Sequence, residues 1–278
     1  MMTDMATKDD ASIVTASPVT IPCAICGLAI TVTPLPPQFG LYLPRSIAHE
    51  ECIKADKERR ERTAREQAID AAKADVNALR ADLPGAMARC GVPSHYLTAS
   101  FAACCDLPSE LVDAARRWAS NPNGILYLHG LPGSGKTWLA VAILRSILAN
   151  GICRPAACRC MSEHDYLGGI KAGFGEGTDE PRRVLPSNHP LRAQVLLYDD
   201  LAAVRQTDWT RGEIAKLVEI RHADDLPTII TSNVAPGSIA QAIDGRVASR
   251  IAEYRMMLEF PRRDLRVSGT RREINDSR

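Results

Sequence analysis

Residues 130–137 read GLPGSGKT and match the phosphate-binding pattern G-x-x-x-x-G-K-[ST]. The apolar run ILYLH precedes this stretch, and the run TWLAVAILRSIL, which starts at Thr137, continues it with helical periodicity. Glycines let backbone N–H groups wrap a phosphate without a Cβ in the way, and the N-terminus of a helix adds its dipole. We therefore expect a nucleotide site rather than a chance glycine-rich turn.

Individual residues of this stretch have separate expected roles. The Lys136 ammonium reaches the β- and γ-phosphate oxygens, and the Thr137 hydroxyl binds magnesium. The residues expected around the nucleotide are Gly130, Gly133, Ser134, Gly135, Lys136 and Thr137. The stretch thus predicts ATP and Mg²⁺ as cofactors.

A second chemical signal is the run VLLYDD at residues 195–200, an apolar strand that ends in two carboxylates. Asp199 is the expected second magnesium ligand, and Asp200 is expected to orient and deprotonate the attacking water. An isolated acidic pair after a strand can also be a helix N-cap, but the preceding phosphate loop favours hydrolysis. Because Asp is shorter than the Glu more often found there, we expect slow ATP hydrolysis.

The run TIITSN at residues 228–233 is another apolar strand that ends in a polar residue. In hydrolases of this architecture such a strand lies between the phosphate-loop strand and the acidic strand. Asn233 is then expected to contact the γ-phosphate and the water together. Taken alone, Ser-Asn after a strand is an ordinary turn signal.

From about residue 90 onward, short apolar runs alternate with helical periods, which predicts an α/β fold with a parallel sheet. The strands are expected at residues 125–129, 156–161, 194–198, 228–231 and 256–260. After Phe260 only 18 of the 278 residues remain, too few for a C-terminal helical lid.

Residues from about 92 to 260 resemble the DnaC/IstB-type helicase-loader branch of the AAA+ P-loop ATPases. The resemblance rests on GVPSHYLTASF, GLPGSGKT, LLYDDL, LVEIRHADDLPTIITSNV and GRVASRIAEY. It implies a P-loop sheet of order like 5-1-4-3-2 without a helical lid. It also implies that Arg250 is an arginine finger presented to ATP in a neighbouring subunit, with Arg246 as its helper, although both could be ordinary solvated helix residues. Arg221 matches a family arginine as well.

Before this domain, Cys23-x-x-Cys26-Gly27 and His49-x-x-Cys52 form two pairs of soft ligands. Each pair has the spacing that lets two side chains converge on one tetrahedral zinc ion, with Gly27 in the tight turn. The alternative is a set of unrelated thiols. We interpret the other six of the nine cysteines as buried free thiols.

These patterns predict four regions. Residues 1–20 are expected to be disordered, 21–53 a zinc-binding module, 54–89 a charged helical linker closed by Pro84-Gly85, and 90–278 the AAA+ ATPase domain. With 34 basic and 33 acidic residues, the net charge of +1 excludes a strongly basic, histone-like protein. The sequence shows no apolar run of membrane-spanning length and no signal peptide, which favours a cytoplasmic protein without membrane contact.

Together, the motifs and the resemblance imply an ATP-dependent loader in DNA replication that places a DnaB-type helicase on single-stranded DNA. It would oligomerise through its arginine finger and hydrolyse ATP in an assembly-dependent way. The arginines expected near DNA are those at 182, 183, 262, 263, 266, 271 and 272. The open alternatives are an IstB-like ATPase helper of a transposase and a P-loop small-molecule kinase.

Overall fold

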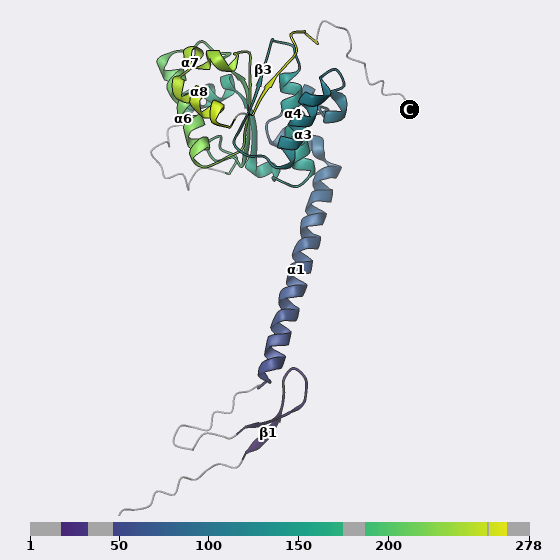
Figure 1. Ribbon diagram of the computed structural model, residues 1–278. Coiled ribbons are helices and arrows are strands. Elements are labelled where there is room, and N and C mark those ends of the chain that lie inside the picture. The colour runs from purple at the N-terminus through teal and green to yellow at the C-terminus, as the bar shows by residue number, and fades with distance from the viewer. Residues whose placement is uncertain (1–17, 33–46, 175–186, 255, 266–278) are drawn as a thin grey trace, which may run out of the picture. The chain divides into compact units, whose positions relative to one another are not determined.

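The computed structural model describes residues 18–32, 47–174, 187–254 and 256–265 (Figure 1). The chain forms two compact units, Met1–Lys73 and Ala74–Arg278, and their boundary lies inside the long helix α1 (Glu50–Ala81). Within the described ranges, no helix has both the length and the apolar character that a membrane span requires.

The larger unit contains a five-stranded parallel sheet. Its strands are β3 (Ile125–His129), β4 (Cys158–Ser162), β5 (Val195–Leu201), β6 (Thr228–Ser232) and β7 (Met257–Glu259). Their spatial order is β4-β5-β6-β3-β7. Numbered by their order within this unit, the strands run 2-3-4-1-5, which is the predicted order 5-1-4-3-2 seen from the other edge. The predicted α/β fold is confirmed.

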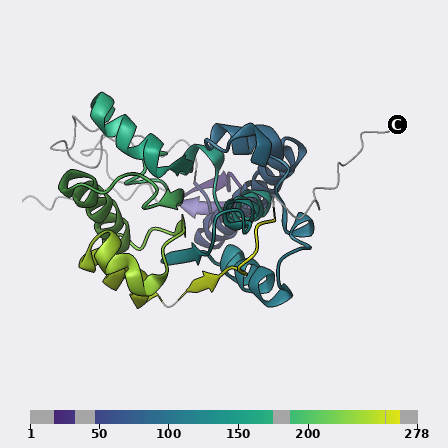
Figure 2. The ribbon, with the colours of Figure 1, turned by 90° about the horizontal axis from the view of Figure 1, so that it is seen from above.

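Helices cover both faces of this sheet, as Figure 1 and the view from above in Figure 2 show. One face carries α2 (Leu83–Arg89), α3 (Ser109–Ser120) and α4 (Lys136–Ala149), and the other carries α5 (Glu163–Gly169), α6 (Asp208–Ala223), α7 (Ile239–Ala242) and α8 (Gly245–Glu253). Short 3-10 turns span Ser94–Tyr96, Phe101–Ala103, Pro155–Ala157 and Pro236–Ser238, and a π-turn spans Ile170–Phe174.

Successive side chains of β3 point to opposite faces of the sheet, so the strand packs against both layers of helices. Leu126 and Leu128 pack into the core that contains α3 and α4, whereas Ile125 and Tyr127 pack into the core that contains α6 and α8. All four side chains are buried because a strand in the middle of a doubly covered sheet has no solvent face. Because β3 lies inside the sheet, between β6 and β7, the phosphate loop that follows it lies at the carboxyl end of the parallel strands.

The prediction that Pro84-Gly85 closes the charged helix was wrong. Helix α1 already ends at Ala81, and both residues lie in the first turn of α2. Proline is tolerated at the start of a helix because its missing N–H would have no partner there. The Asp82 side chain caps this start by accepting a hydrogen bond from the Gly85 N–H at 3.0 Å.

Helix α1 has no buried residue along its 32 positions. Its surface carries ion pairs three and four residues apart, such as Asp56 with Arg59 and Arg60 at 2.7 Å. The part that belongs to the larger unit contacts that unit, since Arg80 Nε donates to the Ala149 carbonyl at 2.7 Å. Its charged surface agrees with the expected solvated linker.

The smaller unit contains an antiparallel pair of short strands, β1 (Val19–Pro22) and β2 (Ala29–Val32). Strand β1 leads into the turn that holds Cys23 and Cys26, while α1 begins one residue after His49. Hydrogen bonds from Cys23 N to Leu28 O and from Gly27 N to Cys23 O tighten this turn.

Some expectations concern residues outside the described ranges. These are the disorder of residues 1–17 and the DNA contacts of the arginines at 182, 183, 266, 271 and 272. No helix follows β7 as far as Leu265, but residues 266–278 are outside the described part, so the absence of a helical lid remains a prediction. The boundary expected after residue 20 was wrong, because Val19 and Thr20 already belong to β1 and pair with β2. The boundaries expected after residues 53 and 89 remain predictions.

Candidate functional site

The loop between β3 and α4 has the backbone of a phosphate cradle. Gly133 and Gly135 adopt φ values of +78° and +97°, which side chains other than glycine rarely allow. Ser134 is 1% exposed, and its hydroxyl has no hydrogen-bond partner in the described structure. An unsatisfied buried hydroxyl in a loop of this shape fits a phosphate oxygen.

The Lys136 ammonium lies inside this loop, and its residue is only 5% exposed. Its Nζ donates to the carbonyl oxygens of Gly130 and Leu131 at 3.0 and 2.9 Å and to Asn233 Oδ1 at 2.8 Å. The side chain that follows β6 thus lies beside the ammonium of the phosphate-loop lysine, and the expected contact of Asn233 with the γ-phosphate and the water remains a prediction. A β- or γ-phosphate oxygen that enters the loop would meet an ammonium that is already held in place.

Asp199 lies directly beneath the loop, in a position that suits magnesium. Its Oδ1 accepts hydrogen bonds from the hydroxyls of Thr137 at 2.9 Å and Thr231 at 2.6 Å. Burial raises the pKa of Asp199 above its ordinary value, and the two hydroxyl donors counteract this rise. The pairing of Thr137 with a carboxylate is the donor set that Mg²⁺ prefers, so these two residues fit the ion.

Asp200 follows on an irregular piece of β5. Its φ is +59°, its side chain is exposed, and the register with β6 shifts between Tyr198 and Leu201. Its backbone N–H donates to Thr231 Oγ1 at 2.9 Å. One hydroxyl, that of Thr231, thus fixes both acidic residues, and no sequence pattern singled it out.

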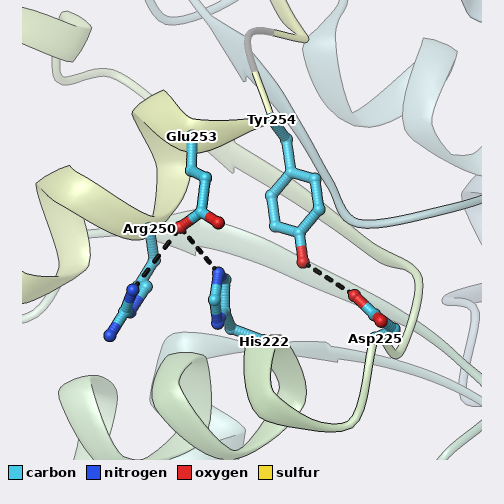
Figure 3. A network of polar contacts seen from close by, with 5 residues as sticks. All are labelled: His222, Asp225, Arg250, Glu253 and Tyr254. Carbon is cyan, nitrogen blue, oxygen red and sulfur yellow. Dashed lines mark hydrogen bonds and ion pairs between the residues drawn. The ribbon is translucent and has the colours of Figure 1, made fainter.

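Arg250 and Arg246 lie on α8 and form ion pairs there. Arg250 Nη1 lies 3.4 Å from Glu253 Oε2, which His222 Nε2 also contacts at 2.8 Å (Figure 3). The His222 contact and the Arg250 pair lower the pKa of Glu253. Arg246 pairs with Glu219 at 3.2 Å. None of the ion pairs and hydrogen bonds of the described residues joins either arginine to the phosphate loop.

The surroundings of Arg221 indicate a structural role. It is 1% exposed and donates to Thr228 Oγ1 and to the carbonyl oxygens of Pro190, Ala193 and Pro227. Burial lowers its pKa to about 9. With its donors committed to these acceptors, Arg221 ties α6 to the start of β6 and is inaccessible to a nucleotide of another subunit.

Three solved structures are similar to this chain. The crystal structure of the DnaC helicase loader matches with 25% identity and a TM-score of 0.50, over 61% of this chain and 100% of that chain. The resemblance to the DnaC-type branch of the AAA+ ATPases is confirmed. The crystal structure of DnaI matches with 22% identity and a TM-score of 0.45, over 61% of this chain and 95% of that one. A putative primosome component from Streptococcus pyogenes serotype M3 has 18% identity and a TM-score of 0.46, with 64% and 96% covered.

Neither the protein-family models nor the curated protein sequences gave a match to the chain. The likeness to the DnaC helicase loader is therefore one of structure.

In the smaller unit, the four predicted metal ligands do converge. The ligand atoms of Cys23, Cys26, His49 and Cys52 all lie within 4.8 Å of one another. Ligands around tetrahedral zinc are about 3.8 Å apart because Zn–S bonds are about 2.3 Å long. Gly27 adopts the positive φ of +75° that the tight turn needs. The donor set therefore fits a closed zinc site.

The remaining cysteines were expected to be buried. Five of them are buried free thiols, but Cys105 is exposed, because it lies in the turn after Phe101–Ala103 rather than on a packed element. Cys153 and Cys158 approach each other to 2.9 Å between their sulfur atoms.

Replacing the buried carboxylate with an amide should separate stability from function. Because burial raises the pKa of Asp199, ionisation makes the native state less stable as the pH rises through that raised value. Asp199→Asn should therefore raise the Tm at pH 7 while it removes Mg²⁺-dependent ATP binding. The difference in Tm should shrink as the pH falls through the raised pKa of Asp199 and should vanish below the pKa of an unfolded aspartate, about 3.9.

The matched control is Asp200→Asn, since that side chain is exposed and asparagine also tolerates a positive φ. Calorimetry should show little change in its Tm. A lower Tm for Asp199→Asn at pH 7 would show that its carboxylate stabilises the fold.

Proposed function

We propose that this chain is an ATP-dependent helicase loader that places a DnaB-type replicative helicase on single-stranded DNA. The observation that carries the proposal is the likeness to the DnaC helicase loader over the whole of that solved chain, together with a phosphate loop and two acidic residues at one sheet edge. The proposed ATP hydrolysis, assembly and partner binding all depend on this replication-related AAA+ fold.

ATP hydrolysis is proposed to use the residues around the loop. Loop N–H groups and Lys136 bind the β- and γ-phosphates, and Thr137 and Asp199 hold Mg²⁺. The ion would neutralise charge on the phosphate oxygens. Asp200 accepts the proton of the attacking water, and Asn233, which already contacts the Lys136 ammonium, orients that water against the γ-phosphate.

Assembly is proposed to complete this site. Arg250 has a side chain that is 42% exposed, and its ion-pair partner Glu253 belongs to the same helix. A guanidinium on an exposed helix face can reach ATP bound by a neighbouring subunit, with Arg246 beside it. Arg262 and Arg263, both exposed near the end of the described chain, are candidate contacts for the phosphates of single-stranded DNA.

The four converging ligands in the smaller unit are proposed to bind one Zn²⁺ ion. A closed site with four protein ligands is structural rather than catalytic. Zinc binding contributes on the order of 10 kcal/mol to the folding of small modules, which otherwise lack a sufficient core. This unit would then be the part that grips a partner such as the helicase.

The function is tested by reconstitution with the full chain. A purified DnaB-type helicase should be recruited to single-stranded DNA coated with a single-strand-binding protein only when the chain and ATP are both present. Unwinding of a forked duplex measures recruitment, and Lys136→Ala is the control that should abolish it. Capture of a transposase instead of the helicase, with no gain in unwinding, would favour an IstB-like helper. ATP-dependent phosphorylation of a small molecule would favour a kinase.

The zinc proposal predicts about one zinc ion per purified chain. Cys26→Ser should lose the metal, because a three-ligand site binds zinc far more weakly, and with it the ordered turn around Gly27. Metal analysis and circular dichroism measure both effects. Cys105→Ser, which removes an exposed thiol elsewhere, should keep the zinc. A parent protein that contains no zinc, and whose circular dichroism spectrum does not change when zinc is added, would contradict the proposal.

Arg250→Ala should abolish assembly-dependent ATP hydrolysis while ATP binding stays near the parental level. Arginine fingers that act in trans contribute roughly 10³- to 10⁵-fold to the rate. Lys136→Ala, by contrast, should weaken nucleotide binding itself. Mixing the two variants should restore part of the activity, because some junctions then pair an intact loop with an intact finger.

The matched control is Arg117→Ala on α3, an exposed arginine outside both motifs. It should hydrolyse ATP like the parent. If Arg250→Ala hydrolyses ATP at the parental rate, or if mixing it with Lys136→Ala restores no activity, then Arg250 is an ordinary surface residue.

A further inference from the structure

The backbone directly after the acidic strand is held in an unusual conformation. Asp200 and Ala202 have φ values of +59° and +66°, although neither is glycine. Such left-handed positions are costly for most residues and persist only where surrounding contacts enforce them. At Ala202 no polar side chain of its own can stabilise the conformation, so the enforcement must come from outside this turn.

Glu163 provides contacts of this kind. Its side chain is fully buried at the start of α5, and Oε2 accepts the Ala202 N–H at 2.5 Å. Its Oε1 accepts the Val204 N–H at 3.3 Å and the Gln206 Nε2 at 2.9 Å. Burial raises the pKa of Glu163, and these donors counteract the rise. Both carboxylate oxygens are thus used to hold residues 202–206.

The other side of the same segment is held by β6. Thr231 Oγ1 accepts the Asp200 N–H at 2.9 Å, and Ser232 Oγ donates to the Leu201 carbonyl at 2.7 Å. The segment is therefore clamped between Glu163 and β6 on either side of residue 201. If the Glu163 side were released, Ala202 could relax to a negative φ, and Asp200, two residues earlier, would turn with it.

We propose that Glu163 is a positioning residue for ATP hydrolysis: its carboxylate enforces the left-handed turn at Ala202 and thereby fixes Asp200. This inference rests on the proposed function, in which Asp200 accepts the proton of the attacking water. A carboxylate is needed because it accepts at both oxygens, whereas an amide keeps one acceptor oxygen and would place its NH2 group against the N–H donors on the other side. Glu163 touches neither nucleotide nor water and acts through the backbone.

The test separates positioning from binding and from folding. Glu163→Gln should lower kcat on the order of 10- to 100-fold, as small misplacements of a reacting group do. The Kd for ATP should stay at the parental value, since Lys136, Thr137 and Asp199 are untouched. Glu110→Gln, an exposed glutamate in the first turn of α3, is the matched control and should change neither value.

A rescue variant makes the mechanism specific. Glycine adopts a positive φ without steric cost, so Ala202→Gly added to Glu163→Gln should recover most of kcat. Absence of recovery would overturn the proposal that Glu163 acts by enforcing this turn. If Glu163→Gln does not fold, Gln206→Ala removes one donor to the carboxylate and should lower kcat about 3-fold at unchanged Kd. Parental kcat in that variant would also overturn the proposal.

Asp200→Asn distinguishes this inference from the proposed function. If Asp200→Asn hydrolyses ATP like the parent, the proposed role of Asp200 is wrong, and the positioning role falls with it. An inactive Asp200→Asn beside a fully active Glu163→Gln would overturn the positioning role alone.

Discussion

The site depends on a buried ammonium that must have acceptors. Lys136 lies almost without exposure at the start of α4, where an unpaired charge would be very costly. Its partners are two carbonyl oxygens of the loop and the side chain of Asn233, so one cation ties the loop after β3 to the end of β6. Since β6 lies between β3 and β5 and the three strands are parallel, their carboxyl ends lie side by side. Asp199, near the carboxyl end of β5, therefore lies under the loop that follows β3. The geometry of the nucleotide site therefore follows from strand order.

Much of this arrangement was predictable because it is written in local patterns. Apolar runs gave all five strands, with β3 correct at both ends, and the order of polar residues after them gave the residues that gather at the sheet edge. The cysteine and histidine spacing likewise predicted which four side chains converge. In each run or ligand pair, the residues that carry the chemistry lie within a few positions of one another in the sequence.

The parts that the sequence did not predict depend on contacts between distant segments. Thr231 fixes both acidic residues only because β6 pairs with β5, and Glu163 reaches Ala202 only because α5 follows the neighbouring strand. Arg221 resembled a site residue until its four buried acceptors were known. The start of α2 was misjudged because Pro84 and Gly85 were interpreted as helix breakers, whereas proline is common in the first turn of a helix that a side chain such as Asp82 caps.

The left-handed backbone at residue 200 also bears on which acid can stand there. Aspartate and asparagine enter this region more readily than other non-glycine residues, because their short side chains can hydrogen-bond locally. A longer glutamate has no such compensation. The left-handed backbone of the turn thus favours Asp over Glu at this position. The shape of the strand end therefore also determines how far the acidic side chain extends toward the nucleotide. A chain that exchanged one acid for the other would have to rebuild the turn as well.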